Sequence, residues 1–344
     1  MACIAIAGAG LAGRLFAWAL SQAGHTVSVL DPAAGPGPAF DGQGAAAFTA
    51  AGMLSPLAEQ ALGDPALVQF GWASLALWPG IVARLTAPVR FQARGSLLLA
   101  HGSDGGAAAR ALARMPGAQA LDAQALTALE PAVAPGLRGW LLPGEGLIHP
   151  VEAMAALHAD SIGVRWRWGE RVAEVRPGAL HLPSGEMLRC DWAIDTRGLG
   201  ARPAQALRGV RGEVVVLDLP DHGLGRPLRL LHPRHRVYLV PRSEHELLLG
   251  ASEIESEDRS PVSLRSAVEL MAAAHSMLPT LAEARITRLD RNLRPALPDN
   301  RPAASVAPGF LQLNGLYRHG WLLAPALVQN LLAETGLASL EHPA

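Results

Sequence analysis

The chain has 344 residues, half of them hydrophobic, and a formal net charge of −1. This length exceeds what one hydrophobic core usually organises, so two domains are expected. The near-neutral charge, with arginines spread along the chain, gives no electrostatic case for nucleic-acid binding. All 29 basic residues are arginine, and the absence of lysine excludes Schiff-base chemistry on a lysine side chain.

Targeting signals and metal sites are not expected. The apolar N-terminus is broken by glycines before it could act as a signal peptide, and no apolar segment of about 18 residues stands out, so we expect a cytoplasmic protein without a membrane span. Cys3 and Cys190 lack metal-ligand spacing and are expected to be buried structural thiols. His232 and His235 have no acidic or cysteine partner at ligand spacing, so a solvated loop is expected there and no metal.

The first elements in chain order form a recognisable unit. An apolar run over 3–7 precedes the glycine-rich turn 8–13, a helical pattern ends near Gly24, and a strand over 25–30 ends at Asp31. Strand, turn, helix, strand and acid in this order are typical of dinucleotide binding.

Each glycine of the turn has its own physical task. Gly8 permits the sharp turn, Gly10 lets the backbone approach a pyrophosphate, and Gly13 lets helix and strand pack closely. The helix beginning near Leu11 directs its N-terminal amides at the diphosphate. Asp31 can accept hydrogen bonds from a ribose diol and would repel a phosphate there, so an NADP-type ligand is disfavoured.

The rest of the chain alternates helical and strand patterns. Helices are predicted over 65–85, within 104–129, over 263–277 and over 321–335. Strands are predicted over 89–100, 164–168, 172–175, 192–195, 213–219, 228–231, 236–240, 246–250 and 310–313. The runs between 163 and 197 are expected to rejoin the nucleotide-binding domain.

Several further segments match one family in its own order. They are AAGMLSP at 50–56, GEGLIHP at 144–150, YLVPR at 238–242, GAS at 250–252, LRPALPD at 293–299 and YRHGWLLAP at 317–325. Together with the turn at 8–13, they resemble the glycine oxidase group, including the thiamine-pathway oxidase, of the FAD-dependent D-amino-acid oxidase superfamily.

The resemblance implies an α/β chain, α+β overall, with a Rossmann-like FAD-binding domain and a second, mostly antiparallel β-sheet substrate domain. The FAD-binding domain would be assembled from 1–85, 143–207 and 291–344, and the substrate domain from 86–142 and 208–290. It implies FAD rather than NAD. The two cysteines do not stand where related oxidases attach flavin covalently, so non-covalent FAD is expected.

The resemblance also implies the site residues. Arg318 matches the family's carboxylate-binding arginine, Arg294 its second arginine, and Tyr238 its active-site tyrosine. The implied cofactor-binding positions are Gly8, Gly10, Leu11, Ala12, Gly13, Asp31, Thr49, Ala51, Gly52, Met53, Val172, Gly320, Trp321 and Leu322. Helix-start amides at Gly320 and Trp321 are expected to stabilise negative charge on the flavin.

Other interpretations of these residues stay open at this point. Arg294 could pair with Asp299 or Asp290 on the surface. Tyr238 could be an ordinary half-buried aromatic of its strand, and Met53 could be core filler. Leu316 and His319 stand where the family commonly has a histidine and an asparagine, which bears on the polarity of the substrate pocket.

The implied activity is oxidative deamination of glycine or another small amino acid: hydride passes from Cα to the flavin N5, an imine forms, and dioxygen is reduced to hydrogen peroxide. Two alternatives are a dehydrogenase for D-amino acids or secondary amines that passes electrons to a quinone or partner, and a non-catalytic flavin-binding subunit. The expected partners are the amino acid, dioxygen and, through thiamine biosynthesis, thiazole synthase. A homo-oligomer is also expected.

Overall fold

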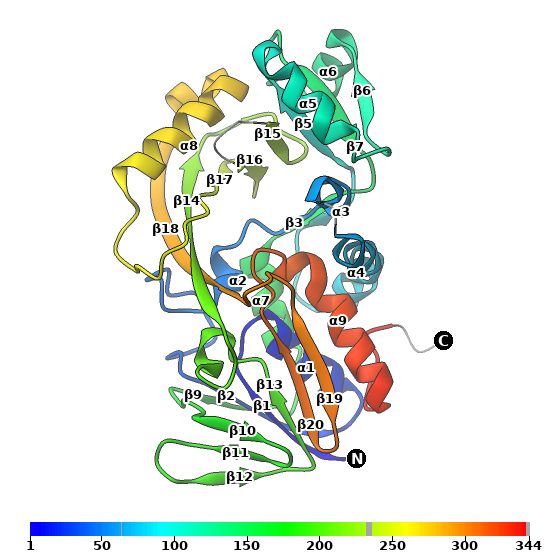
Figure 1. The fold of residues 1–344 in the computed structure, drawn as a ribbon, viewed down its shortest axis with the longest axis vertical. Coiled ribbons are helices and arrows are strands. Elements are labelled where there is room, and N and C mark those ends of the chain that lie inside the picture. The colour runs from blue at the N-terminus through cyan, green and yellow to red at the C-terminus, as the bar shows by residue number, and fades with distance from the viewer. Residues whose placement is uncertain (63, 232–235, 342–344) are drawn as a thin grey trace.

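The computed structural model describes residues 1–62, 64–231 and 236–341. One sheet lies at the lower end of the molecule in Figure 1, a larger sheet lies at the upper end, and several helices lie between and beside them. His232 and His235, for which a solvated loop was predicted, fall outside the described residues.

The lower sheet has six strands in the order β19-β20-β13-β1-β2-β9. Its members are β1 (Cys3–Ala7), β2 (Thr26–Asp31), β9 (Arg165–Trp168), β13 (Trp192–Asp195), β19 (Ala303–Ala307) and β20 (Phe310–Asn314). All neighbouring strands are parallel except β19 and β20. This confirms the Rossmann-like sheet, which contains the predicted runs 164–168 and 192–195 as β9 and β13, whereas the run 172–175 contributes to β10 (Glu174–Arg176) of a separate three-stranded sheet.

Helices cover this sheet and bury its apolar strands. The first is α1 (Leu11–Gln22), whose residues from Leu11 to Leu20 are all buried. It packs with α7 (Pro150–Ala159) and α9 (Gly320–Thr335). Strand β1 is buried from Ile4 to Ala7, as a parallel strand covered on both faces must be.

The upper sheet has eight strands in the order β18-β14-β17-β16-β15-β5-β7-β6. They are β5 (Ser96–Ala100), β6 (Gln119–Leu121), β7 (Arg138–Leu142), β14 (Arg208–Asp218), β15 (Leu228–Leu231), β16 (Arg236–Pro241), β17 (Glu246–Gly250) and β18 (Arg285–Ala296). Only β15 and β5 are parallel neighbours. Helix α8 (Leu264–Met277) packs on this sheet through Leu270, Ala274 and Met277. The mostly antiparallel second sheet is thereby confirmed.

Strand β14 begins five residues before the predicted strand 213–219, and its partner β18 was not predicted as a strand. The first half of β18, Arg285 to Leu289, is exposed, and its apolar residues Ile286 and Leu289 lie three positions apart, so it lacks the alternating pattern of a half-buried strand. The pair still joins from Arg208↔Ala296 to Asp218↔Arg285, with a register shift between Val216 and Leu217. The predicted domain boundary at 290/291 falls inside β18, and the division into domains stays a prediction.

Two predicted segments are subdivided. The strand over 89–100 is interrupted at Gly95, whose φ of +85° separates β4 (Phe91–Gln92) from β5. The helical region 104–129 holds α5 (Gly105–Leu112), strand β6 and α6 (Ala123–Leu129).

The other short elements are α2 (Ala46–Thr49), α3 (Pro56–Glu59), β3 (Met53–Leu54), β8 (Gly146–Ile148), β10 (Glu174–Arg176), β11 (Ala179–His181), β12 (Met187–Arg189) and the 3-10 turns Gln60–Leu62, Gly102–Asp104, Gly198–Ala201 and Pro279–Glu283.

Helix α4 (Pro65–Ala83) corrects the expectation that no long apolar segment exists. It has 19 residues without a charge, and by length and composition alone it could cross a membrane. Its Gly71, Ser74 and Trp78 are buried, and the helix packs beside α9, while 28% of the apolar window is buried. The sequence pattern predicted this helix over 65–85 but not that the helix is long and apolar enough to meet the criterion for a membrane span.

The two cysteines are not both buried, as had been expected. Cys3 is exposed because it begins β1 at the open end of the strand, and Cys190 is half-buried. Burial raises the pKa of the Cys190 thiol to about 11. A protonated thiol is a poor nucleophile, so Cys190 is chemically inert at neutral pH.

Candidate active site

A cavity of about 1080 Å³ lies where the two sheets meet. Asp31, Thr196 and Asn314 line it at the carboxyl ends of the parallel strands, and Val214 and Tyr238 line it from the upper sheet. Ligands bind outside the carboxyl ends of the strands in folds of this kind. The lining contains these predicted positions: Gly8, Gly10, Leu11, Ala12, Asp31, Thr49, Ala51, Gly52, Met53, Val172, Tyr238, Arg294, Arg318, Gly320, Trp321 and Leu322.

Gly13 is the one predicted position outside the lining, and its place explains why. A Cβ at Gly13 would lie 1.9 Å from the carbonyl oxygen of Gly8, so Gly13 packs directly against the turn and not against the cavity. Gly8 itself has a φ of +102°. A Cβ at Gly10 would meet only the Ala45 Cβ, at 4.0 Å, so the cavity side of the turn is open. The three glycines therefore fit a pyrophosphate in the way predicted.

Asp31 ends β2 with both carboxylate oxygens held by the backbone. Oδ2 accepts a hydrogen bond from the amide of Ala9 at 2.7 Å, and Oδ1 accepts one from the amide of Ala33 at 2.8 Å. A carboxylate has about four acceptor positions. The remaining ones can accept bonds from the hydroxyls of a ribose, so Asp31 both fixes the turn and fits the predicted sugar contact.

Arg14 is a site residue that sequence reasoning missed. Its guanidinium is buried and donates to the carbonyl oxygens of Ala9 (2.8 Å), Met154 (2.6 Å) and Pro36 (2.7 Å). Burial lowers the pKa of the Arg14 guanidinium to about 10, although the negative charge of Asp31 acts to raise it. An arginine within an otherwise apolar helix was the available signal. The side chain joins the glycine turn to α7 and to the loop after β2.

Replacing Arg14 with methionine is expected to lower the free energy of unfolding by about 3 kcal/mol and to weaken FAD binding. Three carbonyl groups would lose a charged donor, and buried acceptors left unpaired each cost about 1–3 kcal/mol. Urea denaturation of the apoprotein and FAD titration measure the two effects. Arg165→Met, which removes an exposed arginine from β9 of the sheet that α1 covers, is the matched control and should change neither. Equal stability of the two variants would contradict the role given to Arg14.

The loop after β13 supports the turn from the other side. The Thr196 hydroxyl donates to the carbonyl oxygen of Gly8 at 2.9 Å. Arg197 pairs with Asp195 at 2.8 Å and donates to the carbonyl oxygen of Val172 at 3.1 Å. The predicted adenine-side residue Val172 is thus held by an ion pair at the strand end, which the sequence pattern did not reveal.

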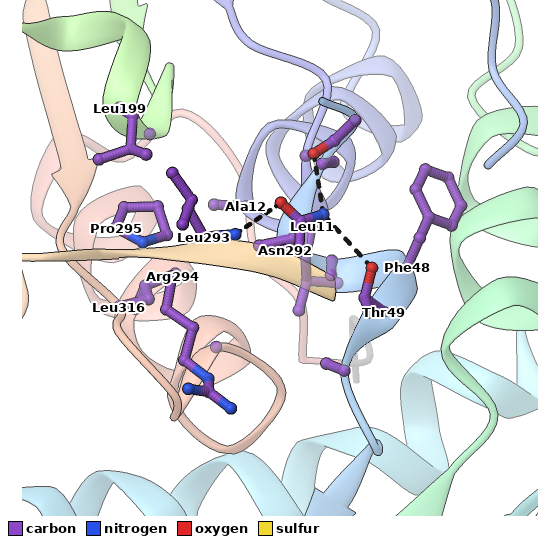
Figure 2. Close-up of a pocket in the computed structure, with 18 of the residues that line it drawn as sticks. Leu11, Ala12, Phe48, Thr49, Leu199, Asn292, Leu293, Arg294, Pro295 and Leu316 are labelled. Atoms are coloured by element: carbon purple, nitrogen blue, oxygen red, sulfur yellow. Dashed lines mark hydrogen bonds between the residues drawn. The ribbon is translucent and has the colours of Figure 1, made fainter. Parts of the chain in front are cut away.

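The middle of the cavity carries the predicted flavin positions. Figure 2 shows Asn292 between Thr49 and Leu293. The Asn292 amide nitrogen donates to the Thr49 hydroxyl at 3.3 Å, and its oxygen accepts from the backbone amide of Leu293 at 2.8 Å. Asn292 was not predicted, although it lies directly before the Leu-Arg-Pro motif. It joins α2 to the second half of β18 in the cavity wall.

The start of α9 faces the same space. The first hydrogen bond within α9 runs from the Leu323 amide to the His319 carbonyl oxygen at 2.9 Å. The amides of Gly320, Trp321 and Leu322 come before it and have no acceptor within the helix. The Trp321 indole donates to the carbonyl oxygen of Ala47 at 3.1 Å, which fixes the helix start against α2. Free amides and the positive end of the helix dipole make this a place that favours negative charge.

Arg318 is held by a carboxylate that was not predicted. Its Nη2 lies 2.7 Å from Oε2 of Glu59, and His319 Nε2 lies 3.2 Å from the same oxygen. Burial alone would raise the pKa of Glu59, but the His319 hydrogen bond and the Arg318 charge lower it to about 2. The loop before α9 is thereby joined to the end of α3, and His319, which stands at a position where the family commonly differs, serves this junction.

This ion pair predicts a defined dependence of stability on pH. The ordinary pKa of the Glu59 carboxyl is 4.5 and its folded-state value is about 2, so its stabilisation is complete above pH 4.5 and is lost as the pH falls toward 2. The shift corresponds to about 3 kcal/mol. The difference in unfolding free energy between the protein and Glu59→Gln should shrink across this interval in urea titrations. A constant difference would mean that Glu59 is not ionised in the folded protein.

Arg294 points into the cavity rather than to a surface acid. Figure 2 shows its side chain on the opposite side of β18 from Leu293. Its guanidinium donates to the carbonyl oxygens of Arg211 (3.3 Å) and Ser252 (3.0 Å). Gly212 makes the room, because a Cβ there would lie 2.3 Å from Nη2 of Arg294.

The surface alternative for Arg294 is therefore wrong. Asp290 pairs with Arg288 at 2.7 Å. Asp299 accepts a hydrogen bond from the backbone amide of Arg301 at 3.0 Å. Neither carboxylate is a partner of Arg294, whose guanidinium donates to backbone carbonyls instead.

Tyr238 lies on β16 with its ring in the cavity lining. Its strand partner is Gly250, where a Cβ would lie 2.7 Å from the phenol oxygen, so this glycine makes room for the ring. Burial raises the pKa of the Tyr238 phenol, which stays a neutral hydrogen-bond donor at physiological pH. Arg229, directly opposite Tyr238 on β15, lines the cavity as well and was not predicted.

The cavity therefore combines two kinds of binding group. The glycine turn, Asp31 and the start of α9 fit a dinucleotide, and Arg294, Arg318 and Tyr238 converge on a chamber suited to a small carboxylate. None of the described lining residues is a cysteine, in keeping with non-covalent attachment. The fold and site define an oxidoreductase that holds a dinucleotide between a Rossmann-like sheet and an antiparallel sheet.

Comparison with known proteins identifies the family. The chain belongs to the FAD dependent oxidoreductase family DAO, whose model matches residues 3–334, so its cofactor is FAD. It is 37% identical over 338 residues to a protein of Rhizobium etli assigned as a thiamine biosynthesis oxidoreductase, ThiO, with 97% of each chain covered. It is 26% identical to the bifunctional protein ThiO/ThiG of a Nostoc species, covering 96% of this chain and 52% of that one. The solved glycine oxidase of Geobacillus kaustophilus shares its fold, with a TM-score of 0.83, 24% identity, and 97% and 94% of the two chains covered.

Proposed function

We propose that this protein oxidises glycine or another small amino acid with bound FAD. The observation that carries the proposal is the meeting of a carboxylate-binding chamber with the FAD site in one cavity. When bound, FAD accepts a hydride from the substrate Cα and passes the electrons to dioxygen, which yields an imine and hydrogen peroxide. The relatives named as ThiO and glycine oxidase support this class of substrate.

The chain's own residues orient the substrate. Arg318, held by Glu59, presents its remaining N–H groups to the α-carboxylate, and Arg294 adds a second positive charge to the chamber. The neutral phenol of Tyr238 can donate a hydrogen bond to the same carboxylate. No protein nucleophile is required, because the protein supplies orientation and charge.

Anaerobic titration of the purified yellow protein tests the proposal. Glycine or sarcosine is expected to bleach the flavin absorbance, and admission of air should restore it with formation of peroxide. Bleaching that persists in air would place the protein among the dehydrogenases, which pass electrons to a quinone or a partner. An FAD-loaded protein that no amino acid bleaches would leave a non-catalytic flavin-binding subunit.

We further propose that the product imine serves thiazole formation in thiamine biosynthesis. The support is the fusion of a ThiO part with a ThiG part in the Nostoc relative, of which this chain spans about half. On this proposal the protein is a cytoplasmic homo-oligomer that associates with a separate thiazole synthase. Size-exclusion chromatography of the two purified proteins, alone and mixed, measures both associations. Independent elution of the two proteins at micromolar concentrations would contradict a stable complex.

A further inference from the structure

Arg229 is a cation in the substrate chamber with no hydrogen-bonded or ion-paired partner among residues 1–62, 64–231 and 236–341. It lies on β15, and its side chain shares the face of the sheet that carries Leu98 and Tyr238, its direct neighbours on β5 and β16. Its Nε is buried and has no hydrogen-bond partner. Within the described part of the chain, the guanidinium makes no hydrogen bond and no ion pair within 4.0 Å. Arg229 as a whole is half-buried, but a buried donor left without an acceptor is costly, which marks this side chain as a group that awaits a ligand.

The other cations of the chamber differ from Arg229. Arg318 is neutralised by Glu59 at 2.7 Å, and Arg294 has two backbone acceptors. Glu59 already contacts both Arg318 and His319, so its negative charge is largely balanced by them and compensates Arg229 little. The chamber therefore holds more positive charge than one substrate carboxylate can balance.

Glu145 is the other carboxylate near Arg229, and it does not compensate the charge. It is fully buried, its Oε1 accepts a bond from the Ala58 amide at 2.7 Å, and its Oε2 accepts one from the Ser96 hydroxyl at 2.5 Å. Burial raises the pKa of Glu145, although the Arg229 charge acts in the opposite direction. A carboxyl in this environment is biased toward its neutral form.

We propose that Arg229 binds a second carboxylate, so that the site accepts amino acids carrying two carboxylate groups. One carboxylate occupies the Arg318, Arg294 and Tyr238 end of the chamber, and the other reaches Arg229. This inference rests on the proposed function, since it names the substrate class of the same site. It makes Arg229 the residue that sets specificity between acidic and neutral substrates.

Ligand binding to the FAD-loaded protein tests the second subsite without turnover. Succinate and propionate differ by one carboxylate, and each is titrated while the flavin spectrum or fluorescence is followed. The unmodified protein should bind succinate at least about tenfold more tightly than propionate, as one charge-assisted contact provides. Arg229→Gln should abolish this preference while leaving propionate affinity within about twofold. Arg229→Lys should retain part of it.

The matched control is Arg265→Met, which removes an exposed arginine, 82% accessible, from α8 on the same sheet. It should preserve the preference for succinate. Equal binding of succinate and propionate to the unmodified protein would overturn the proposal. So would an equal loss of affinity for both ligands in Arg229→Gln, because Arg229 would then act on the single shared carboxylate. If Arg229→Gln fails to retain FAD, the test uses Arg229→Lys and the unmodified protein, and the preference for succinate over propionate should be smaller in Arg229→Lys.

Turnover separates this inference from the proposed function. D-Aspartate against D-asparagine, and iminodiacetate against sarcosine, should show kcat/KM ratios that favour the diacids in the protein and fall at least about tenfold in Arg229→Gln. A preference for succinate without flavin reduction by any amino acid would preserve the second subsite and reject the oxidase. Reduction of the flavin by glycine without any preference for diacids would support the oxidase and reject the second carboxylate subsite.

Discussion

Replacing Arg318 with methionine is expected to slow reduction of the flavin by amino acids about 10- to 100-fold while FAD stays bound. The guanidinium is the predicted partner of the substrate α-carboxylate, and hydrogen bonds to charged groups are worth about 1.5–3 kcal/mol. Methionine keeps much of the side-chain volume but supplies no donor. Stopped-flow absorbance under anaerobic conditions measures the rate of reduction, and FAD titration measures retention of the cofactor.

This variant also removes the arginine partner of Glu59, whose buried carboxylate then keeps only the His319 contact named above, and this loss by itself costs stability. The control is the double variant Glu59→Gln/Arg318→Met, which removes both charges. Stability should recover in the double variant, whereas the rate of flavin reduction should stay low. Recovery of the rate would show that Arg318 acts by neutralising Glu59 and not by binding the substrate.

Gly13→Ala is expected to have the second large effect and to impair FAD binding and folding together. The added Cβ would lie 1.9 Å from the Gly8 carbonyl oxygen and 2.9 Å from the Thr196 hydroxyl. Backbone must therefore move, and overpacking of this kind costs about 1–3 kcal/mol or more. The displaced turn would also withdraw its amides from the pyrophosphate.

Two readouts separate these effects. Urea denaturation of the apoprotein reports the loss of stability, and isothermal titration with FAD reports the loss of affinity. Gly80→Ala is a matched control, because its Cβ meets nothing within 4 Å and it lies in helix α4. It should be neutral or slightly stabilising. A Gly13→Ala protein that binds FAD with unchanged affinity would refute the packing role of this glycine.

The nucleotide-binding half was predictable because its signals are local. The run 3–7, the turn 8–13 and Asp31 lie close together in the chain, and the turn permits few conformations without glycine. Strand alternation likewise located β15 and β17 at their observed bounds. The family resemblance brought together Arg318, Arg294 and Tyr238, which the structure places around one cavity, while their catalytic roles stay predictions.

The partners of these residues could not be predicted, because each is fixed by pairing across distant segments. Glu59 reaches Arg318 over 259 positions, and Asn292 reaches Thr49 over 243. Arg229 meets Tyr238 only through the register of β15 and β16. No periodicity in the chain encodes such contacts. Strand β18 was missed for a related reason, since the first half of this edge strand is exposed and lacks the alternating apolar residues of a half-buried strand.

The two glycines beneath Arg294 and Tyr238 make four positions of the pocket interdependent. A side chain at 212 would displace the arginine, and one at 250 would displace the tyrosine. Redesign of substrate choice must therefore vary 212 with 294 and 250 with 238, and libraries that randomise one member of a pair will consist mostly of inactive variants. The converse also holds: shortening either large residue opens a void that a side chain at the facing glycine can fill, which offers a direct route to a reshaped chamber.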